Sequence, residues 1–70
     1  MKSLVPLVML GLVDSIVSGY AVSEISYRDG SIEIIELPVN LFPCEIKEGD
    51  FFYVTKISGV TEVRCGEPPD

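Results

Sequence analysis

Turn-forming glycines at regular intervals constrain the fold of this 70-residue chain more than any other feature of its sequence. They separate short runs rich in Val, Ile, Tyr, Phe and Thr, residue types that favour β-strands. Glycine reaches positive φ without steric cost, and Asp-Gly is a strong signal for a β-hairpin. The turn signals are Ser18-Gly19, residues 28–30, residues 48–50 and Ser58-Gly59. Their spacing predicts an all-β fold, a small five-stranded, barrel-like antiparallel sheet of the SH3-like or OB-like kind.

The limits of the domain follow from the same spacing. A chain of this length has room for one domain. We expect a single β-barrel-like domain over residues 10–65, preceded by an apolar N-terminal extension at 1–9 and followed by an exposed tail at 66–70. A helix over residues 3–17 is the main alternative for the first segment. Pro6, Gly11 and several β-branched residues disfavour that helix.

The apolar N-terminus also resembles a secretory signal, because Lys2 precedes about ten mostly apolar residues. However, Pro6 interrupts the run, Asp14 ends it, and cleavage beyond it would delete one strand of an expected hairpin. The run is too short to span a bilayer as a helix. We therefore expect a cytoplasmic protein, with secretion as the alternative. Cys44 and Cys65 are interpreted as buried, reduced thiols, and a bridge between them belongs to the secretion alternative.

The run at residues 32–37 departs from simple alternation. Glu33 and Glu36 lie three positions apart, so a regular strand would direct them to opposite faces. A β-bulge near Ile34-Ile35 would direct both carboxylates outward and bend the strand, as closure of a small barrel requires. The sequence therefore predicts a bulge at this point.

The connector that follows, residues 37–44, contains two prolines, which disfavour a central strand. Leu41 and Phe42 are its large apolar residues. We expect both to close one end of the core.

The charge of the chain is strongly acidic. Eleven Asp and Glu residues against five Lys and Arg give a formal net charge of −6 at pH 7. Such a surface repels phosphate groups, whereas nucleic-acid affinity comes largely from Lys and Arg. Unaided binding to nucleic acid is therefore disfavoured. The acids are spread along the chain, so solubility is the simplest reason for the charge.

Residue types that carry out catalysis are scarce. The chain has no histidine, the usual general base and commonest metal ligand, and two cysteines cannot complete a structural zinc site. Cys44 beside Glu45 is the one cysteine–carboxylate pair adjacent in sequence, and packing explains this cysteine more simply. The six glycines are dispersed, with no phosphate-binding loop. We expect no enzymatic activity, no cofactor and no metal.

Consecutive aromatic residues at positions 51–53 are the strongest candidate for a contact surface. Neighbouring side chains of a strand point to opposite faces, so Phe51 and Phe52 cannot both enter one core. Either the N-terminal extension covers the outward ring, or that ring anchors a partner, since aromatic residues are enriched at interfaces. The apolar segment 4–12 presents the same choice, because it either folds back over a ring or pairs with a second copy of the chain. The candidate partner-contact residues are Tyr20, Tyr27, Phe51, Phe52 and Tyr53.

Several short motifs follow one another in a specific order. They are Val13-Asp14-Ser15-Ile16, Gly19-Tyr20-Ala21-Val22, Asp29-Gly30, Leu37-Pro38, Leu41-Phe42-Pro43 and Lys47-Glu48-Gly49-Asp50. This order resembles the small bacterial family catalogued as domain of unknown function 3006, over residues 10–57. Ser15 stands where that family usually has a basic residue, and Ser18 where it usually has an acidic one. The resemblance implies a compact β-rich domain, alone or appended to larger proteins such as metallo-hydrolases, with no established activity and no catalytic residues.

These observations favour a non-catalytic accessory or protein-interaction module that binds a protein partner through an aromatic and acidic surface. One alternative is an acidic inhibitor that mimics nucleic acid in the basic cleft of a partner, which requires the carboxylates to cluster on one face. A further alternative is a small nucleic-acid-binding barrel with aromatic stacking platforms.

Overall fold

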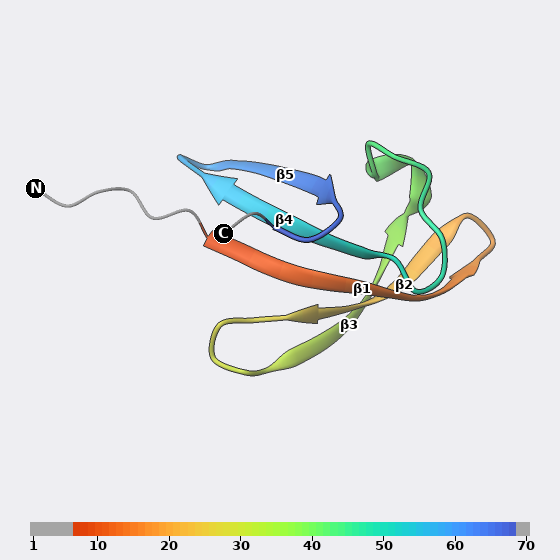
Figure 1. Cartoon of the computed structure of the whole chain (residues 1–70), viewed down its shortest axis with the longest axis horizontal. Coiled ribbons are helices and arrows are strands. Elements are labelled where there is room, and N and C mark those ends of the chain that lie inside the picture. The colour runs from red at the N-terminus through yellow and green to blue at the C-terminus, as the bar shows by residue number, and fades with distance from the viewer. Residues whose placement is uncertain (1–6, 69–70) are drawn as a thin grey trace, which may run out of the picture.

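The computed structural model describes residues 7–68, which form an all-β chain with almost no helix (Figure 1). All five strands belong to one antiparallel sheet, in the order β3-β2-β1-β4-β5. The elements are β1 (Leu7–Val17), β2 (Tyr20–Ser26), β3 (Ile32–Pro38), the 3-10 turn η1 (Val39–Leu41), β4 (Phe51–Ile57) and β5 (Val60–Cys65). The predicted five-stranded antiparallel sheet is confirmed.

The sheet is open. No ladder joins β3 to β5 among the described residues, so these two strands form its edges. The central strand β1 pairs with β2 along one side and with β4 along the other, and the β2–β3 and β4–β5 hairpins diverge from it (Figure 1). Closure into a barrel, which the sequence analysis predicted, is not observed.

The two tightest hairpins share one kind of turn. Ser18 and Ser58 have φ of 52°, and the glycines that follow them, Gly19 and Gly59, have φ of 83° and 82°. Positive φ at both central residues is typical of the type I′ turn, whose twist matches that of the flanking strands. The Ser-Gly pairs at these positions therefore act as the hairpin turns that the sequence predicted.

The sheet contains a bulge, but not at the predicted place. The pairing of β1 with β2 runs from Val13↔Ser23 directly to Ser15↔Val22, which leaves Asp14 as the extra residue of β1. By contrast, β2 pairs with β3 in unbroken register through Ile34 and Ile35. The predicted bulge near Ile34-Ile35 is therefore wrong.

The position of β3 in the sheet explains why it needs no bulge. Glu33 and Glu36 do lie on opposite faces, since they pair with Ile25 and Val22 of β2. Both carboxylates are nevertheless exposed, because β3 is an edge strand and neither of its faces is fully covered. In a central strand with a covered face, a carboxylate on that face would be buried. In the edge strand β3 it remains exposed.

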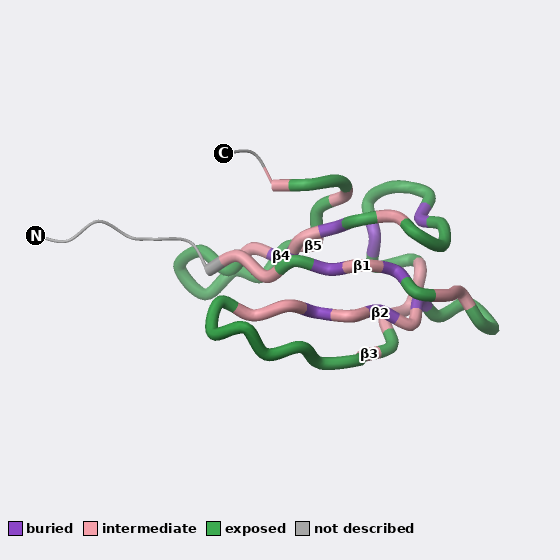
Figure 2. Tube along the Cα trace, turned by 60° about the horizontal axis from the view of Figure 1, so that its bottom comes forward, coloured by how far each residue is buried: buried purple, intermediate pink, exposed green. Residues whose placement is uncertain are grey.

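The core lies between one face of the sheet and residues 42–50, the segment between η1 and β4 that is called the connector from here on (Figure 2). The Phe42 ring meets the Phe52 ring edge-on, with centroids 5.0 Å apart at an interplanar angle of 89°. Phe42 closes the core as predicted, whereas Leu41 is 52% exposed and does not. The buried apolar residues are Val13, Ala21, Ile25, Phe42, Ile46, Phe52 and Val54.

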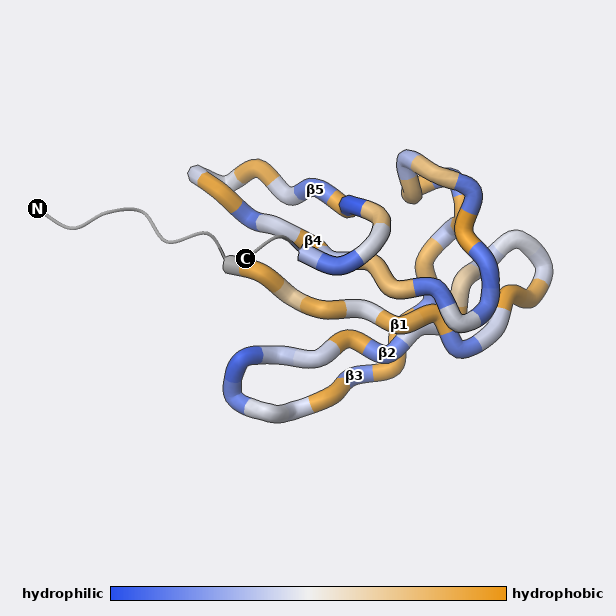
Figure 3. Tube along the Cα trace, viewed as in Figure 1, coloured by the Kyte–Doolittle hydropathy of each residue, from blue (hydrophilic) through white to orange (hydrophobic). Residues whose placement is uncertain are grey.

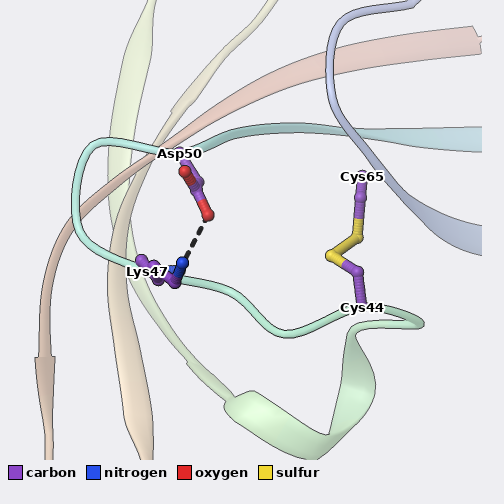
Figure 4. The surroundings of a disulfide bond; sticks show 4 residues. All are labelled: Cys44, Lys47, Asp50 and Cys65. Carbon is purple, nitrogen blue, oxygen red and sulfur yellow. Dashed lines mark hydrogen bonds between the residues drawn. A yellow bond between two sulfur atoms is a disulfide. The ribbon is translucent and has the colours of Figure 1, made fainter.

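Backbone hydrogen bonds fasten the connector to the central strand. The Val13 amide donates to the carbonyl of Asp50 at 3.0 Å, and the Gly49 amide donates to the carbonyl of Val13 at 2.8 Å. The Asp50 carboxylate also accepts a hydrogen bond from the Lys47 amide at 2.9 Å, which closes the turn (Figure 4). The Lys-Glu-Gly-Asp motif therefore fixes the position of the connector relative to β1.

A disulfide between Cys44 and Cys65 joins the connector to the end of β5 (Figure 4). The preferred interpretation of two buried, reduced thiols is therefore wrong, and Cys44 is in fact exposed. The bridge links the connector, which covers the core, covalently to β5.

The first strand begins earlier than predicted. Residues 7–9, which the sequence assigned to an extension, belong to β1 and pair with residues 54–56 of β4. Residues 1–6, the first part of the segment considered for an export signal, lie outside the described part of the chain. Among residues 7–68 there is no helix with the length and apolar character needed to cross a membrane.

Candidate functional site

The face of the sheet that points away from the connector is the candidate functional site, and we call it the open face. Side chains alternate along each strand, so residues flanking a core position point to this face. Along β1 and β4 they are Leu10, Leu12, Phe51 and Tyr53, which flank Gly11 and Phe52. Leu10 is 47% exposed and Phe51 is 51% exposed. The open face therefore has large apolar side chains at its centre, where nothing among the described residues covers them fully.

The composition of β1 accounts for this surface. Most of the strand is hydrophobic rather than alternating between apolar and polar residues (Figure 3). A half-exposed strand of an antiparallel sheet usually alternates, whereas a run that is apolar throughout is typical of a strand covered on both faces. β1 thus has the sequence pattern of a strand that is buried on both faces, but only one of its faces is covered.

A groove of about 430 Å³ lies on the open face. Leu12 lies at the floor of the groove, where it pairs with Glu24 of β2 on one side and with Phe51 of β4 on the other. Leu10 and Ser26, which pair with each other, continue it.

The segment after β5 forms the far wall of this groove. The Gly66 amide donates to the carbonyl of Phe51 at 2.9 Å, and this bond holds the segment beside β4. Glu67 and Pro68 line the groove as a result. Residues 66–68 are thus part of the site, rather than only an exposed tail.

Carboxylates gather at the β2 side of the groove. The bulge places Asp14 near Glu24. Hydrogen bonding with the Asp14 carboxyl group, together with the negative charge of Asp14, raises the pKa of Glu24 above its usual value. Across the sheet, the Arg64 guanidinium of β5 donates to the Glu62 carboxylate at 2.7 Å. Arg64, the one described cation on this part of the open face, is therefore already paired with Glu62.

The aromatic candidates from the sequence do not form one cluster. Phe51 and Tyr53 lie on the open face, whereas Phe52 is 1% exposed in the core and is withdrawn from the candidate surface. Tyr20 lies at the far end of β2, beside the Ser-Gly turn. Tyr27 packs against the core, and its hydroxyl donates to Glu33 at 2.6 Å, which raises the pKa of the tyrosine.

The sequence pointed to Leu10 and Leu12 only as members of the apolar segment 4–12, and it gave no indication of Glu24 or of the segment 66–68 as parts of the site. The unbroken apolar character of β1 was a usable signal for the two leucines. No sequence signal places Glu24 beside Asp14, because that proximity depends on the bulge. The turn of residues 66–68 against Phe51 is likewise a tertiary feature.

Cys44, the cysteine beside a carboxylate, is joined to Cys65. Within residues 7–68, no three acidic or cysteine side chains lie close enough together to hold a metal ion. The notable property of the site is instead an apolar floor with acidic walls.

Comparisons of the chain with protein-family models, with curated proteins and with solved structures gave no significant match.

Proposed function

We propose that this chain is a non-catalytic protein-interaction module that binds a protein partner through the open face. The observation that carries the proposal is the pair of half-exposed side chains, Leu10 and Phe51, at the centre of the open face. Contiguous exposed apolar surface on a small protein usually marks a contact site. A large aromatic ring beside aliphatic side chains is the usual centre of such a site.

The finer fold assignment is also a proposal. The strand order β3-β2-β1-β4-β5 becomes a five-stranded barrel if the two edge strands approach each other. An OB-like or SH3-like relationship, and a place in the bacterial family catalogued as domain of unknown function 3006, are compatible with this order. The turn at residues 47–50, which fastens the connector to β1, gives the shared Lys-Glu-Gly-Asp motif a structural reason.

The distribution of carboxylates favours this function over mimicry of nucleic acid. Such a mimic requires its acids to gather on one face, in place of a phosphate backbone. Here the described carboxylates are divided between the two sides of the sheet. Glu33 lies on the face opposite the open face, and Glu45, Glu48 and Asp50 lie in the connector, whereas the open face has Asp14, Glu24, Glu36, Glu62 and Glu67. Binding of nucleic acid itself is opposed by the net charge of −6.

An oxidising compartment is part of the proposal. Disulfides persist in secreted and periplasmic proteins and are rare in the cytosol. The Cys44–Cys65 bridge therefore favours the secretion alternative over the cytoplasmic location expected from the sequence.

A pull-down from the source organism with matched variants tests the proposal. Phe51→Ser removes an aromatic ring from the centre of the open face, and Ile57→Ser removes a similarly exposed side chain, at 48%, from the end of β4. We expect a captured partner to be lost with Phe51→Ser and kept with Ile57→Ser. A partner kept equally by both variants would contradict binding through the open face, and a monomer that captures nothing would contradict an interaction role.

A further inference from the structure

The groove on the open face combines an apolar floor with two carboxylates on opposite sides. Glu24 projects from β2 and Glu67 follows β5, while Leu10, Leu12 and Phe51 lie between them. Asp14 adds a third carboxyl group beside Glu24. Among residues 7–68, no lysine or arginine lines the groove.

This arrangement discriminates between classes of occupant by charge. A second copy of the chain would bring the same acidic walls, and the total charge of −6 on each copy would oppose association. Nucleic acids and anionic lipid surfaces are repelled for the same reason. An apolar segment that also carries positive charge satisfies both the floor and the walls.

We propose that the groove binds a cationic, apolar peptide segment of a protein partner. An apolar side chain of the segment would cover Leu10 and Phe51, and a Lys or Arg side chain would reach Glu24 and its neighbour Asp14. Glu67 would contact a second cation at the far wall. This inference rests on the proposed function and adds to it the chemistry of the partner.

The dimensions of the groove fit such a segment. A volume of about 430 Å³ falls within the range of small binding clefts, about 300–1,000 Å³. Leu12 pairs with both Glu24 and Phe51, so the acidic wall and the aromatic ring lie one strand to either side of it. Adjacent strands are about 5 Å apart, so one long basic side chain beside an apolar one can reach both.

A labelled heptapeptide of alternating lysine and leucine is a suitable probe, with two matched peptides in which glutamate replaces lysine or serine replaces leucine. Binding to the disulfide-bonded chain is measured by fluorescence anisotropy, and the contact surface by changes in amide chemical shifts. We expect the lysine–leucine peptide to bind most tightly, to weaken with salt, and to shift the amides of residues 10–12, 24 and 51.

Variants of the groove sharpen the test. Phe51→Ser should weaken binding about tenfold, as expected for the centre of a contact site. Glu24→Gln should weaken it about threefold, the scale of one exposed ion pair. The controls Ile57→Ser and Glu36→Gln, which lie outside the groove, should change the affinity less than about twofold.

Three results would overturn the inference. One is equal binding of the lysine and glutamate peptides. Another is a set of amide chemical-shift changes confined to the acidic residues of the connector or of the β2–β3 turn. The third is a concentration-dependent shift of groove amides in the free protein, which would assign the face to self-association. If the glutamate peptide binds in the groove and Phe51→Ser abolishes it, the interaction role stands and only the cationic partner is wrong.

Discussion

Gly11 shows how a single residue sets the packing of the core. The Phe52 ring lies directly against the backbone of β1 at Gly11, and a Cβ there would overlap the ring. Phe52 is almost fully buried and also meets Phe42, so it has little freedom to move. In this place the glycine provides space for an aromatic ring rather than a turn.

Gly11→Ala should therefore lower the free energy of unfolding by about 2 kcal/mol, the cost of overpacking a filled core. Denaturant titration with the disulfide intact measures this change. In a Phe52→Leu background, which removes the ring, the same substitution should cost clearly less. An equal cost in both backgrounds would contradict the contact as its cause.

Glu24 gives the protein a predictable dependence on pH. Its pKa is raised in the folded state by the hydrogen bond to Asp14 and by the charge of that residue. A group with a raised folded pKa contributes stability that is present below its unfolded pKa and is lost as the pH rises through the folded value. The contribution of Glu24 is therefore present at acidic pH and lost toward neutral pH.

Glu24→Gln should remove this dependence, because glutamine does not titrate. We expect the variant to be more stable than the wild type near pH 7, and the difference to disappear well below the unfolded pKa of 4.5, where Glu24 is protonated in both states. The midpoint of urea unfolding across this range measures it. Asp29, whose pKa is lowered by hydrogen bonds from Ser31, acts in both proteins and cancels in the difference. A constant difference at all pH values would rule out titration of Glu24 as the cause.

At the scale of the element, the two Ser-Gly hairpin turns carry a local strain that substitution can probe. Ser18 and Ser58 occupy the left-handed region, which asparagine tolerates better than serine and which β-branched residues avoid. We expect Ser18→Asn to stabilise the fold by about 0.5 kcal/mol and Ser18→Val to destabilise it by about 1–2 kcal/mol. Thermal unfolding of both variants measures the effect. Ser26→Val, in the extended backbone of β2, is the control, and an equal loss there would argue against backbone strain.

The strands and their turns could be predicted from the sequence because local signals specify them. Ser18-Gly19 and Ser58-Gly59 are sufficient to define two hairpins. The predicted position of the bulge was wrong because we assumed that one face of this strand is covered, so that Glu33 and Glu36 must both point outward. Only the order of strands in the sheet shows that β3 is an edge strand. Phe51, a contact candidate from the sequence, lies on the open face, but its proximity to Leu12 and Glu24 depends on strand pairing, which no local pattern specifies.

At the scale of the whole molecule, the open sheet leaves the connector as the one described cover of the core. That cover depends on a few backbone bonds to β1 and on the disulfide that joins Cys44 to Cys65. A small domain buries a limited apolar area, so a covalent link contributes a large part of its stability. The bridge spans a sequence separation of 21 residues, which includes all of β4 and β5.

Removal of the bridge by Cys44→Ala with Cys65→Ala should lower the free energy of unfolding by about 3 kcal/mol, from the entropy of closing a loop of this length. We expect the connector to loosen first, because β1–β4 and β4–β5 pairing does not depend on it. Hydrogen exchange should then rise at the amides of Phe42 and Gly49 before those of β4. Reduction of the wild type should reproduce the loss, whereas the same reductant should leave the double variant unchanged. Uniform exchange across the sheet would instead mean that the bridge supports the whole fold rather than the cover of its core.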